Sequence, residues 1–421
     1  MKVSIAIDKR SEEIELNDEL VLAVLEQNDV TFERSGTAAV EAALERPIGT
    51  PKLEELIRAG EKIAIVTSDI TRPLPSKLVL PPILKRLEAV GIKDEDILIV
   101  FALGAHRFHT EEEMRFLVGD EIFERYRCVD SDPQAMTYLG ATDGGTPVSI
   151  DNRVIEADRR ITLGNIEYHY FAGYSGGAKA ILPGVSTREA IQANHSRMLE
   201  PGAEAGRADG NPVRLDLEEG IKKFIPIDFI VNVVLDEHKQ IIHAVAGDFV
   251  EAHREGCKFL DRLYLKPIDE RADIVIVSQG GWPKDLNLYQ TQKALDNAKH
   301  AVKDGGVIIL VGSCKEGLGE EVFEQWITEA DTPDELIERI QATFELGGHK
   351  AAAIAQVLKR AEIYLVSEME RAFVRSIFME GFDDIASAYE QAQAKFVGRG
   401  TVIVMPYGGS TLPRVKNEQS Q

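Results

Sequence analysis

The sequence predicts an α/β protein of two domains, with mixed or parallel sheets, flanking helices and a Rossmann-like second domain. Short apolar runs bounded by turn residues alternate with stretches of helical periodicity, which is the pattern of α/β proteins. A length of 421 residues exceeds what one hydrophobic core usually serves. A polar stretch at residues 266–272 separates two series of such strand and helix units. We therefore place a domain boundary there.

The first domain is expected over residues 1–268, completed by a returning segment at about 398–421. Its strands are predicted at 62–66, 96–103 and 160–164, followed by a hairpin at 228–234 and 240–245. A helix at 82–90 begins with proline and ends at a glycine, as helices prefer. A further helix is expected at 250–263.

The second domain is expected over residues 272–397, where strands and helices alternate as in a doubly wound sheet. Strands are predicted from 273, at 306–311 and at 363–366, and helices at 289–302, 333–343, 350–360 and 384–396. The last strand, 401–405, is the one that would return to the first domain. The active site is expected in the cleft between the domains.

Charge and composition exclude several classes of partner. With 70 acidic and 48 basic residues, the net charge of −22 repels nucleic acid and anionic membranes. An anionic substrate would therefore need local positive charge. Three cysteines without a Cys-x-x-Cys motif indicate neither a disulfide framework nor a cysteine zinc site. No apolar run suits a signal peptide or a membrane span, so a cytoplasmic protein without membrane partners is expected.

Polar side chains follow two of the predicted strands. Asp69 and Arg72 come after the strand at 62–66, and His106 follows the strand at 96–103. Ligands of open α/β sheets collect at the carboxyl ends of strands. Chemistry is therefore expected at these positions, whereas His109 is expected to have a structural role.

The segment from His169 to Gly184 holds a histidine, a glycine-rich turn and a lone lysine. A phosphate-binding P-loop would need Ser or Thr after the lysine, but Lys179 is followed by Ala180. The segment is thus either a turn with a solvated lysine or a site whose lysine holds its ligand covalently. Ser186 and Glu189 have capping-box spacing and start a helix that carries His195.

Five segments in this order resemble the motifs of the nickel-dependent lactate racemase family. They are Asp69-Ile-Thr-Arg72-Pro, Gly104-Ala-His106-Arg107, His169-Tyr-Phe-Ala-Gly-Tyr-Ser-Gly-Gly-Ala-Lys179, Asn194-His195 and Tyr289-Gln290-Thr-Gln-Lys293. The histidine and lysine of the third motif are ten residues apart, and His195 follows sixteen residues after Lys179. This combination is far more specific than any single motif.

The resemblance implies a cofactor and a metal. Lys179 would carry pyridinium-3,5-bisthiocarboxylic acid mononucleotide, the nickel-pincer nucleotide, through a thioamide bond. His195 would complete the coordination of nickel, and neutral imidazole suits that metal. Asp69 and Arg72 would lie along the cofactor. The proteins that build the cofactor would be partners.

The resemblance also implies an isomerase, a racemase or epimerase that inverts C2 of a 2-hydroxy acid, with lactate as the default substrate. His106 and His169 would act as acid and base on opposite faces of the substrate carbon. Arg72, Gln290 and Lys293 would bind the substrate. Two alternatives remain: a cofactor-binding or carrier protein of the same fold without turnover, and a zinc hydrolase that uses scattered histidines.

Overall fold

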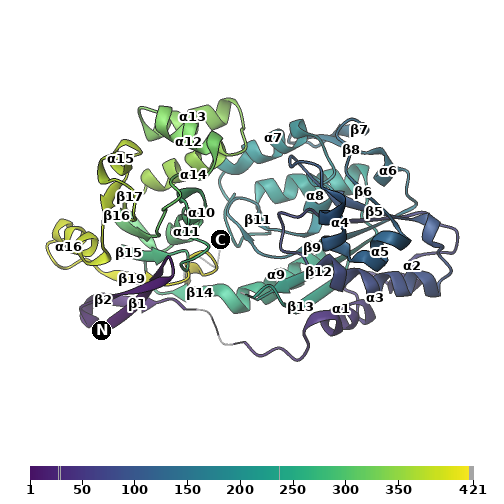
Figure 1. Ribbon diagram of the computed structural model, residues 1–421, viewed down its shortest axis with the longest axis horizontal. Coiled ribbons are helices and arrows are strands. Elements are labelled where there is room, and N and C mark those ends of the chain that lie inside the picture. The colour runs from purple at the N-terminus through teal and green to yellow at the C-terminus, as the bar shows by residue number, and fades with distance from the viewer. Residues whose placement is uncertain (27, 29, 237, 417–421) are drawn as a thin grey trace. The chain divides into compact units, whose positions relative to one another are not determined.

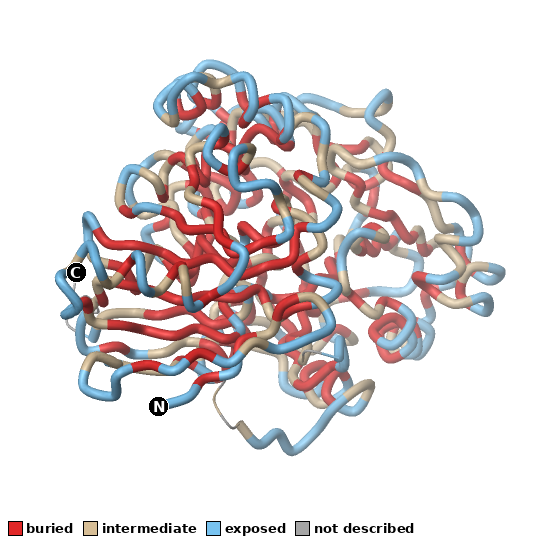
Figure 2. The backbone as a smooth tube through the Cα atoms, turned by 60° about the vertical axis from the view of Figure 1, so that its left-hand side comes forward, coloured by how far each residue is buried: buried red, intermediate tan, exposed pale blue. Residues whose placement is uncertain are grey.

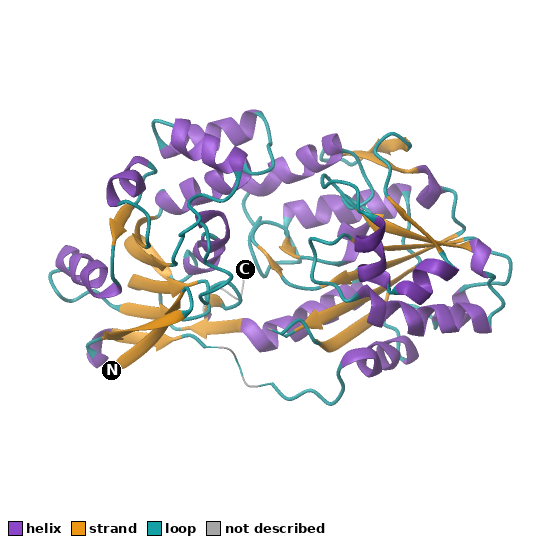
Figure 3. Cartoon of the chain, in the orientation of Figure 1, coloured by secondary structure: helices purple, strands orange, loops and turns teal. Residues whose placement is uncertain are grey.

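The computed structural model describes residues 1–26, 28, 30–236 and 238–416 (Figure 1). It forms two compact units. The inserted unit is Val30–Arg262, and the terminal unit combines Met1–Asp29 with Leu263–Gln421. Each unit is a sheet with flanking helices (Figure 3), so the predicted two-domain α/β class is confirmed. No helix among the described residues is long and apolar enough to cross a membrane.

The inserted unit is built on a six-stranded sheet of order β13-β12-β9-β4-β5-β6. Its strands are β4 (Ile63–Ser68), β5 (Ile97–Ala102), β6 (Arg127–Asp130), β9 (Arg159–Asn165), β12 (Phe229–Leu235) and β13 (Ile241–Gly247). All neighbours pair in parallel except β12 and β13, which form the predicted hairpin. The sheet is therefore mixed, and β4, β5 and β9 lie at its centre with their carboxyl ends at one edge.

One face of this sheet packs against an apolar layer of helices: α1 (Gly36–Glu45), α2 (Leu53–Leu56), α3 (Ser76–Ala89), α4 (Glu111–Val118) and α5 (Asp120–Arg125). Alternate strand residues such as Ile63 and Ile65 point into that layer and are fully buried. The buried strands appear in red in Figure 2. Further elements of the unit include the hairpin β7 (Met136–Ala141) and β8 (Pro147–Asp151), and the helices α6 (Asn152–Ile155), α7 (Arg188–Ser196), α8 (Pro212–Phe224) and α9 (Glu251–Tyr264).

Helix α3 is longer than the predicted 82–90. It begins at Ser76, and Pro81 and Pro82 lie inside it. The prediction of a start at proline was wrong because the helical residues before the prolines include the buried Val79 and Leu80. Burial of these side chains favours the helix against the loss of hydrogen bonds at the prolines.

The terminal unit has an all-parallel sheet of order β18-β17-β16-β15-β19-β3. Its strands are β3 (Val21–Val24), β15 (Ala272–Ser278), β16 (Val302–Val311), β17 (Ala361–Val366), β18 (Glu380–Phe382) and β19 (Val402–Met405). Its helices are α10 (Leu288–Thr291), α11 (Lys293–Ala298), α12 (Glu321–Glu329), α13 (Pro333–Ala342), α14 (Gly348–Leu358), α15 (Arg371–Ser376) and α16 (Ile385–Lys395). Parallel strands with intervening helices agree with the Rossmann-like prediction.

The two chain ends differ from the predicted layout, because both belong to the terminal unit. Strand β19 pairs with β15 and β3, so it does not return to the inserted unit. The N-terminal hairpin of β1 (Lys2–Ile7) and β2 (Arg10–Glu15) packs its apolar side chains on the same sheet. The physical reason is burial: Ile5 and Ile7 are at most 2% exposed in that core.

The helix expected over 289–302 is also different. It forms two short helices, α10 and α11, that meet at Gln292, and Val302 already belongs to strand β16. The helices expected near 333–343, 350–360 and 384–396 are present as α13, α14 and α16. A short strand pair, β14 (Leu265–Ile268) with β20 (Leu412–Val415), completes this unit.

Candidate active site

Three loops leave the central strands of the inserted unit at the same edge. Asp69 follows β4, His106 follows β5, and the segment that carries His169 follows β9. Because β4 pairs with both β5 and β9 in parallel, these loops are neighbours. The strand-end positions chosen from the sequence thus converge on the edge where α/β sheets bind ligands.

The structure joins Asp69 and His106 directly. Oδ2 of Asp69 lies 2.6 Å from Nδ1 of His106, and the Thr71 hydroxyl donates to the Asp69 carboxylate at 2.9 Å. Burial opposes ionisation of Asp69, but the hydrogen bonds from His106 and Thr71 and the nearby Arg72 charge leave its pKa below the usual value. The ionised carboxylate accepts a hydrogen bond from Nδ1 of His106, so a neutral ring has Nε2 as its acceptor nitrogen.

A second histidine and aspartate pair lies beside the first and supports it. Nδ1 of His109 contacts Oδ1 of Asp130 at 2.5 Å, and its Nε2 accepts the Ile70 N–H at 3.0 Å. The His109 side chain is 1% exposed, whereas that of His106 is 33% exposed. His109 thus holds the Asp69 loop through its backbone, in agreement with the structural role expected for it.

His169 lies in a tight hairpin formed by β10 (Tyr168–His169) and β11 (Gly173–Tyr174). Its Nδ1 accepts the N–H of Ala172 at 3.3 Å. Burial, and then the positive charge of Lys179, lowers the pKa of His169 well below its usual value. A neutral ring that accepts at Nδ1 carries its proton on Nε2, which is the opposite tautomer from His106.

The Lys179 segment folds onto the sheet as a short 3-10 turn, η3 (Gly177–Ala180), which packs against β9 and β4. The Gly177 N–H donates to Oδ1 of Asn232 on β12 at 2.8 Å. Burial, followed by the charges of Arg214 and Arg72, lowers the pKa of Lys179 well below its usual value. The amine is therefore disposed to be neutral and nucleophilic.

Phe171 brings three of the expected residues together. Its ring centroid lies 4.5 Å from that of His169 and 4.9 Å from that of His195. Nζ of Lys179 lies 5.8 Å from the same ring. Phe171 is 3% exposed, so the three polar side chains surround a buried aromatic spacer.

His195 is on α7, close to the end of the helix. The cap is Thr187, whose side chain accepts the Ala190 N–H at 3.3 Å, so the predicted cap at Ser186 was off by one residue. The Ser186 hydroxyl instead donates to the carbonyl of Ser149 at 2.7 Å. The capping-box spacing points to Ser186 as the cap, but the hydroxyl of Ser186 is used in this tertiary hydrogen bond instead.

Arg72 is exposed, and its backbone N–H donates to the carbonyl of Asp69 at 3.1 Å. Its positive charge contributes to the lowered pKa values of Asp69, His169 and Lys179. Arg72 therefore acts electrostatically on both parts of the site. It supplies local positive charge in a chain whose net charge is −22.

The other two expected substrate residues, Gln290 and Lys293, belong to the terminal unit. They contact each other, because Nζ of Lys293 donates to Oε1 of Gln290 at 2.6 Å. Lys350 on α14 supports them: its Nζ donates to the carbonyl of Tyr289 at 2.9 Å and lies 3.8 Å from the centre of that ring. Burial, together with the Lys293 charge, lowers the pKa of Lys350 to about 7.

Two family models match this chain. The lactate racemase N-terminal domain matches residues 7–206, and the lactate racemase C-terminal domain matches residues 268–412. The chain belongs to the lactate racemase family. Racemases are isomerases, so the expected enzyme class is confirmed.

Relatives of the lactate racemase family match over nearly their full length. The lactate racemase of Thermoanaerobacterium thermosaccharolyticum is 33% identical over 98% of this chain and 99% of its own. That of Lactiplantibacillus plantarum is 34% identical over 96% of this chain and 98% of its own. The apoprotein structure from T. thermosaccharolyticum has a TM-score of 0.87 and covers 98% of this chain and 100% of its own. A Thermotoga maritima protein at 19% identity, with a TM-score of 0.63, shares the fold over 90% of this chain and 97% of its own.

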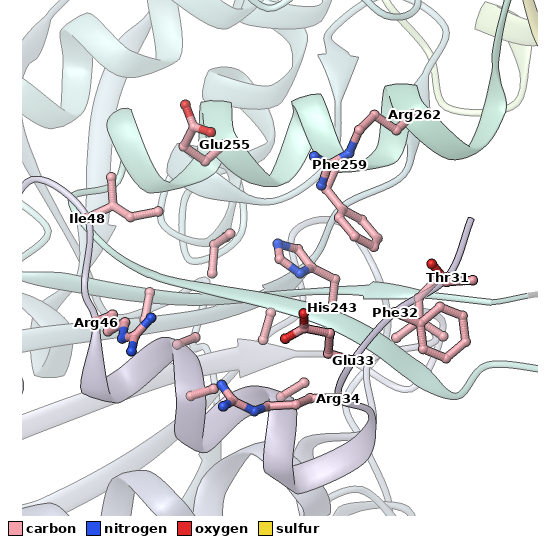
Figure 4. A pocket seen from close by; sticks show the side chains of 17 residues that line it. Thr31, Phe32, Glu33, Arg34, Arg46, Ile48, His243, Glu255, Phe259 and Arg262 are labelled. Atoms are coloured by element: carbon pink, nitrogen blue, oxygen red, sulfur yellow. The ribbon is translucent and has the colours of Figure 1, made fainter.

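A cavity of about 490 Å³ in this racemase-family chain lies away from the strand-end loops, and no residue expected in the site lines it. It is bounded by α1, β13 and α9 (Figure 4). His243 stacks on Phe259 there with centroids 3.9 Å apart, and burial lowers the pKa of His243 to about 4. These contacts pack His243 against α9.

Sequence reasoning missed two residues that contact the motifs of the lactate racemase family: Phe171, beside His169 and His195, and Lys350, beside Tyr289. Phe171 lies inside a quoted motif, but an aromatic residue there also fits an ordinary core. Lys350 gave no signal, because its burial arises from the packing of α14 on α11, which no local pattern records. Lys350 contacts the Tyr289 motif only through tertiary structure, because the two are far apart in the sequence.

Proposed function

We propose that this protein inverts C2 of a 2-hydroxy acid, with lactate as the first substrate to test. The observation that carries the proposal is the grouping of Lys179, His195 and His169 around the ring of Phe171. The paired Asp69 and His106 lie at the same sheet edge. Names of the relatives support the substrate, since two of them are lactate racemases at 33% and 34% identity.

The residues present fit a lysine-tethered nickel-pincer nucleotide. A lowered lysine pKa favours acyl transfer to its amine, and the imidazole of His195 suits nickel as a donor. Among the described residues, no three His, Cys, Asp or Glu side chains are placed to hold a metal ion. A metal at His195 would therefore need donors from a bound cofactor, which is what a pincer ligand provides. A three-ligand zinc hydrolase site gains no support from this donor set.

Lys179 and His195 are the residues that would hold the cofactor, with Asp69 and Arg72 beside it. When bound, the nickel-pincer nucleotide supplies a reversible hydride acceptor. Such an acceptor answers a chemical difficulty, because removing the α-proton beside a carboxylate would create a doubly negative species. General base help of roughly 10²- to 10⁴-fold is too small to cover that cost alone.

The two histidines offer complementary proton states. His106 presents an acceptor at Nε2, because Asp69 holds its Nδ1–H, and so it suits removal of the substrate hydroxyl proton. His169 presents a donor at Nε2, because its Nδ1 accepts the Ala172 N–H, and so it suits protonation of the keto oxygen. Inversion needs one such group for each face of the carbon. With these tautomers, His106 can accept a proton and His169 can donate one, which serves one direction of the reaction. For the reverse direction the two histidines must exchange these proton states.

Arg72, Gln290 and Lys293 would bind the substrate. The Arg72 guanidinium suits a carboxylate, since its planar fork can donate two parallel hydrogen bonds. Lys293 adds a point charge and Gln290 a polar contact. The dependence on cofactor-building proteins and a cytoplasmic location are parts of the same proposal.

The test is to produce the chain together with nickel-pincer biosynthesis proteins and to measure intact mass, nickel and lactate racemisation. We expect a mononucleotide-sized adduct that Lys179→Ala abolishes, with nickel that His195→Ala removes while the adduct stays. In single turnover, His106→Ala and His169→Ala should each form keto acid from a different enantiomer. Loaded protein that leaves every 2-hydroxy acid unchanged would overturn the racemase and favour the carrier function.

A further inference from the structure

Helix α8 contacts all three segments that carry the expected chemistry. We propose that α8 is the element that sets the relative positions of His169, Lys179 and His195, through the positioning residues Asn211, Arg214 and Asp216. The roles of the three positioned residues rest on the proposed function. None of the motifs from which the family was inferred contains a residue of α8.

Asn211 links α8 to the His169 hairpin. It is the N-cap of the helix, where its Oδ1 accepts the Arg214 N–H at 3.1 Å. Its Nδ2 donates to the carbonyl of Phe171 at 2.9 Å, and the residue is fully buried. The start of α8 and the position of the Phe171 spacer are therefore fixed by one side chain.

Arg214 links α8 to the glycine-rich turn. Its guanidinium donates to the carbonyl of Gly176 at 3.0 Å and to that of Tyr174, and the side chain is fully buried. His253 on α9 donates to the carbonyl between them, that of Ser175, at 2.8 Å. Arg214 and His253 thus donate hydrogen bonds to three successive backbone carbonyls that precede Lys179. The hydrogen bonds from Nη1 and Nη2 to two of these carbonyls offset part of the cost of burying the guanidinium.

Close packing leaves this turn little freedom. A Cβ at Gly177 would lie 3.0 Å from the His253 ring and 3.3 Å from the Arg214 guanidinium, and Gly177 has a φ of +60°. The turn therefore packs directly against the side chains of His253 and Arg214. The Arg214 charge also reaches Lys179, whose pKa it helps to lower.

Asp216 links α8 to the helix of His195. Its carboxylate accepts from Nδ2 of Asn194 at 2.8 Å, and Asn194 also donates to the carbonyl of Val213 at 3.0 Å. The hydroxyls of Thr142 and Thr146 donate to the same carboxylate at 2.5 and 2.7 Å. Asn194 directly precedes His195, so the last turn of α7 is docked on α8.

The spacing along α8 explains how one helix serves these segments. Residues 211 and 214 are three apart and share a face, whereas 216 is two positions further and points elsewhere. Helix α8 accordingly packs against both η3 and α7. Because an α-helix is a stiff rod with a fixed rise of about 1.5 Å per residue, it keeps the lysine and the two histidines at constant separations.

Glu218 on the same helix provides a matched control. It is also buried, at 3% exposure, and its carboxylate pairs with Arg254 of α9 at 2.8 Å. Among the described residues its hydrogen bonds go to Arg254 and to none of the three segments, although its charge acts on Arg214. Glu218→Gln keeps an acceptor for Arg254, so it should cost stability while it breaks no hydrogen bond that reaches the three segments.

The experiment uses hydrogen exchange of the apoprotein and, in parallel, adduct mass and nickel content of protein made with the biosynthesis proteins. Arg214→Lys should speed exchange in 174–181 by about tenfold and reduce the adduct fraction, since an ammonium does not replace the fork. Asp216→Asn should speed exchange in 189–196 and weaken nickel retention by about 10–100-fold at unchanged adduct. Asn211→Asp keeps the cap and should loosen only 168–174.

Glu218→Gln should lower the thermal midpoint and leave all these readouts unchanged. The proposal is overturned if the three variants match Glu218→Gln in segment exchange and in the ratio of nickel to adduct, whatever their thermal midpoints. If Arg214→Lys does not fold, the other two variants decide the matter by the same criteria. A wild-type protein that never carries the adduct contradicts the proposed function alone, because apoprotein exchange still reports on α8.

Discussion

Nδ1 of His106 lies 2.6 Å from Oδ2 of Asp69, and the two residues come from loops that follow adjacent parallel strands. The neighbouring pair of His109 and Asp130 has the same chemistry at 2.5 Å. The two pairs differ in exposure, since the His106 side chain is 33% exposed and that of His109 is 1% exposed. Of these two histidines, His106 is therefore the one exposed enough to contact a bound molecule.

Asp69→Asn should reduce racemisation of both enantiomers by about 10²- to 10⁴-fold while the thermal midpoint changes little. The amide cannot accept the His106 proton as a carboxylate does, so the ring takes the wrong tautomer. Steady-state kinetics of the loaded enzyme measures this effect. Asp130→Asn is the control and should lower stability more than turnover. Equal losses of turnover in the two variants would contradict the assignment of Asp69 to His106.

Lys179 in the apoprotein should react with an amine-acetylating reagent at lower pH than a surface lysine. Because its pKa is lowered, the neutral, reactive form of Lys179 appears at a lower pH than that of an ordinary lysine, whereas Lys258 has a pKa raised by its hydrogen bond to Glu255. Mass spectrometry of peptides labelled over a pH series gives each midpoint. The pH midpoint of labelling is compared, and not the labelling rate, because the rate also depends on how accessible each lysine is to the reagent. A Lys179 midpoint at or above that of Lys258 would refute the prediction.

Arg72→Lys should raise KM for lactate by about 10–100-fold, with a smaller change in kcat. The substitution keeps the positive charge but loses the paired hydrogen bonds that a planar guanidinium donates to a carboxylate. Initial rates over a range of lactate concentrations separate the two constants. The matched control is Arg107→Lys, on an arginine that pairs with Glu113 outside the expected substrate contacts. Unchanged saturation for Arg72→Lys would remove this residue from the substrate site.

Lys350 should make stability depend on pH above neutrality. Its folded pKa of about 7 lies below the ordinary lysine pKa of 10.5, so between these values the unfolded chain binds the extra proton. Stability contributed by this group therefore rises with pH across that window, by up to about 1.4 kcal/mol per pH unit. Chemical unfolding of wild type and Lys350→Met at pH 7.5 and 9 measures it. The difference between the two proteins should change with pH, and a constant difference would contradict the lowered pKa.

The central strands of the inserted unit, and the loops at their carboxyl ends, could be predicted from the sequence. Buried strands are recognisable there as apolar runs that end in polar residues. The five motifs identified the family for the same reason, since their residues are local in the chain. The placement of β3 and β19 could not be predicted, because a short apolar strand does not encode which sheet it joins. Asn211, Arg214 and Asp216 also gave no signal, since each acts only through partners distant in sequence.

Strand β19, near residue 402, lies between β15 and the N-terminal strand β3 in its sheet. This arrangement determines the order in which the two units can fold during synthesis. On the ribosome, the inserted unit is complete once residue 262 has emerged, and domains generally fold as units. Strand β3 is made before it but has no partner until the last strand appears about 380 residues later in the chain. A nascent chain that stalls before Val402 would therefore hold a finished inserted unit and an unpaired strand edge, which is a template for pairing with another chain.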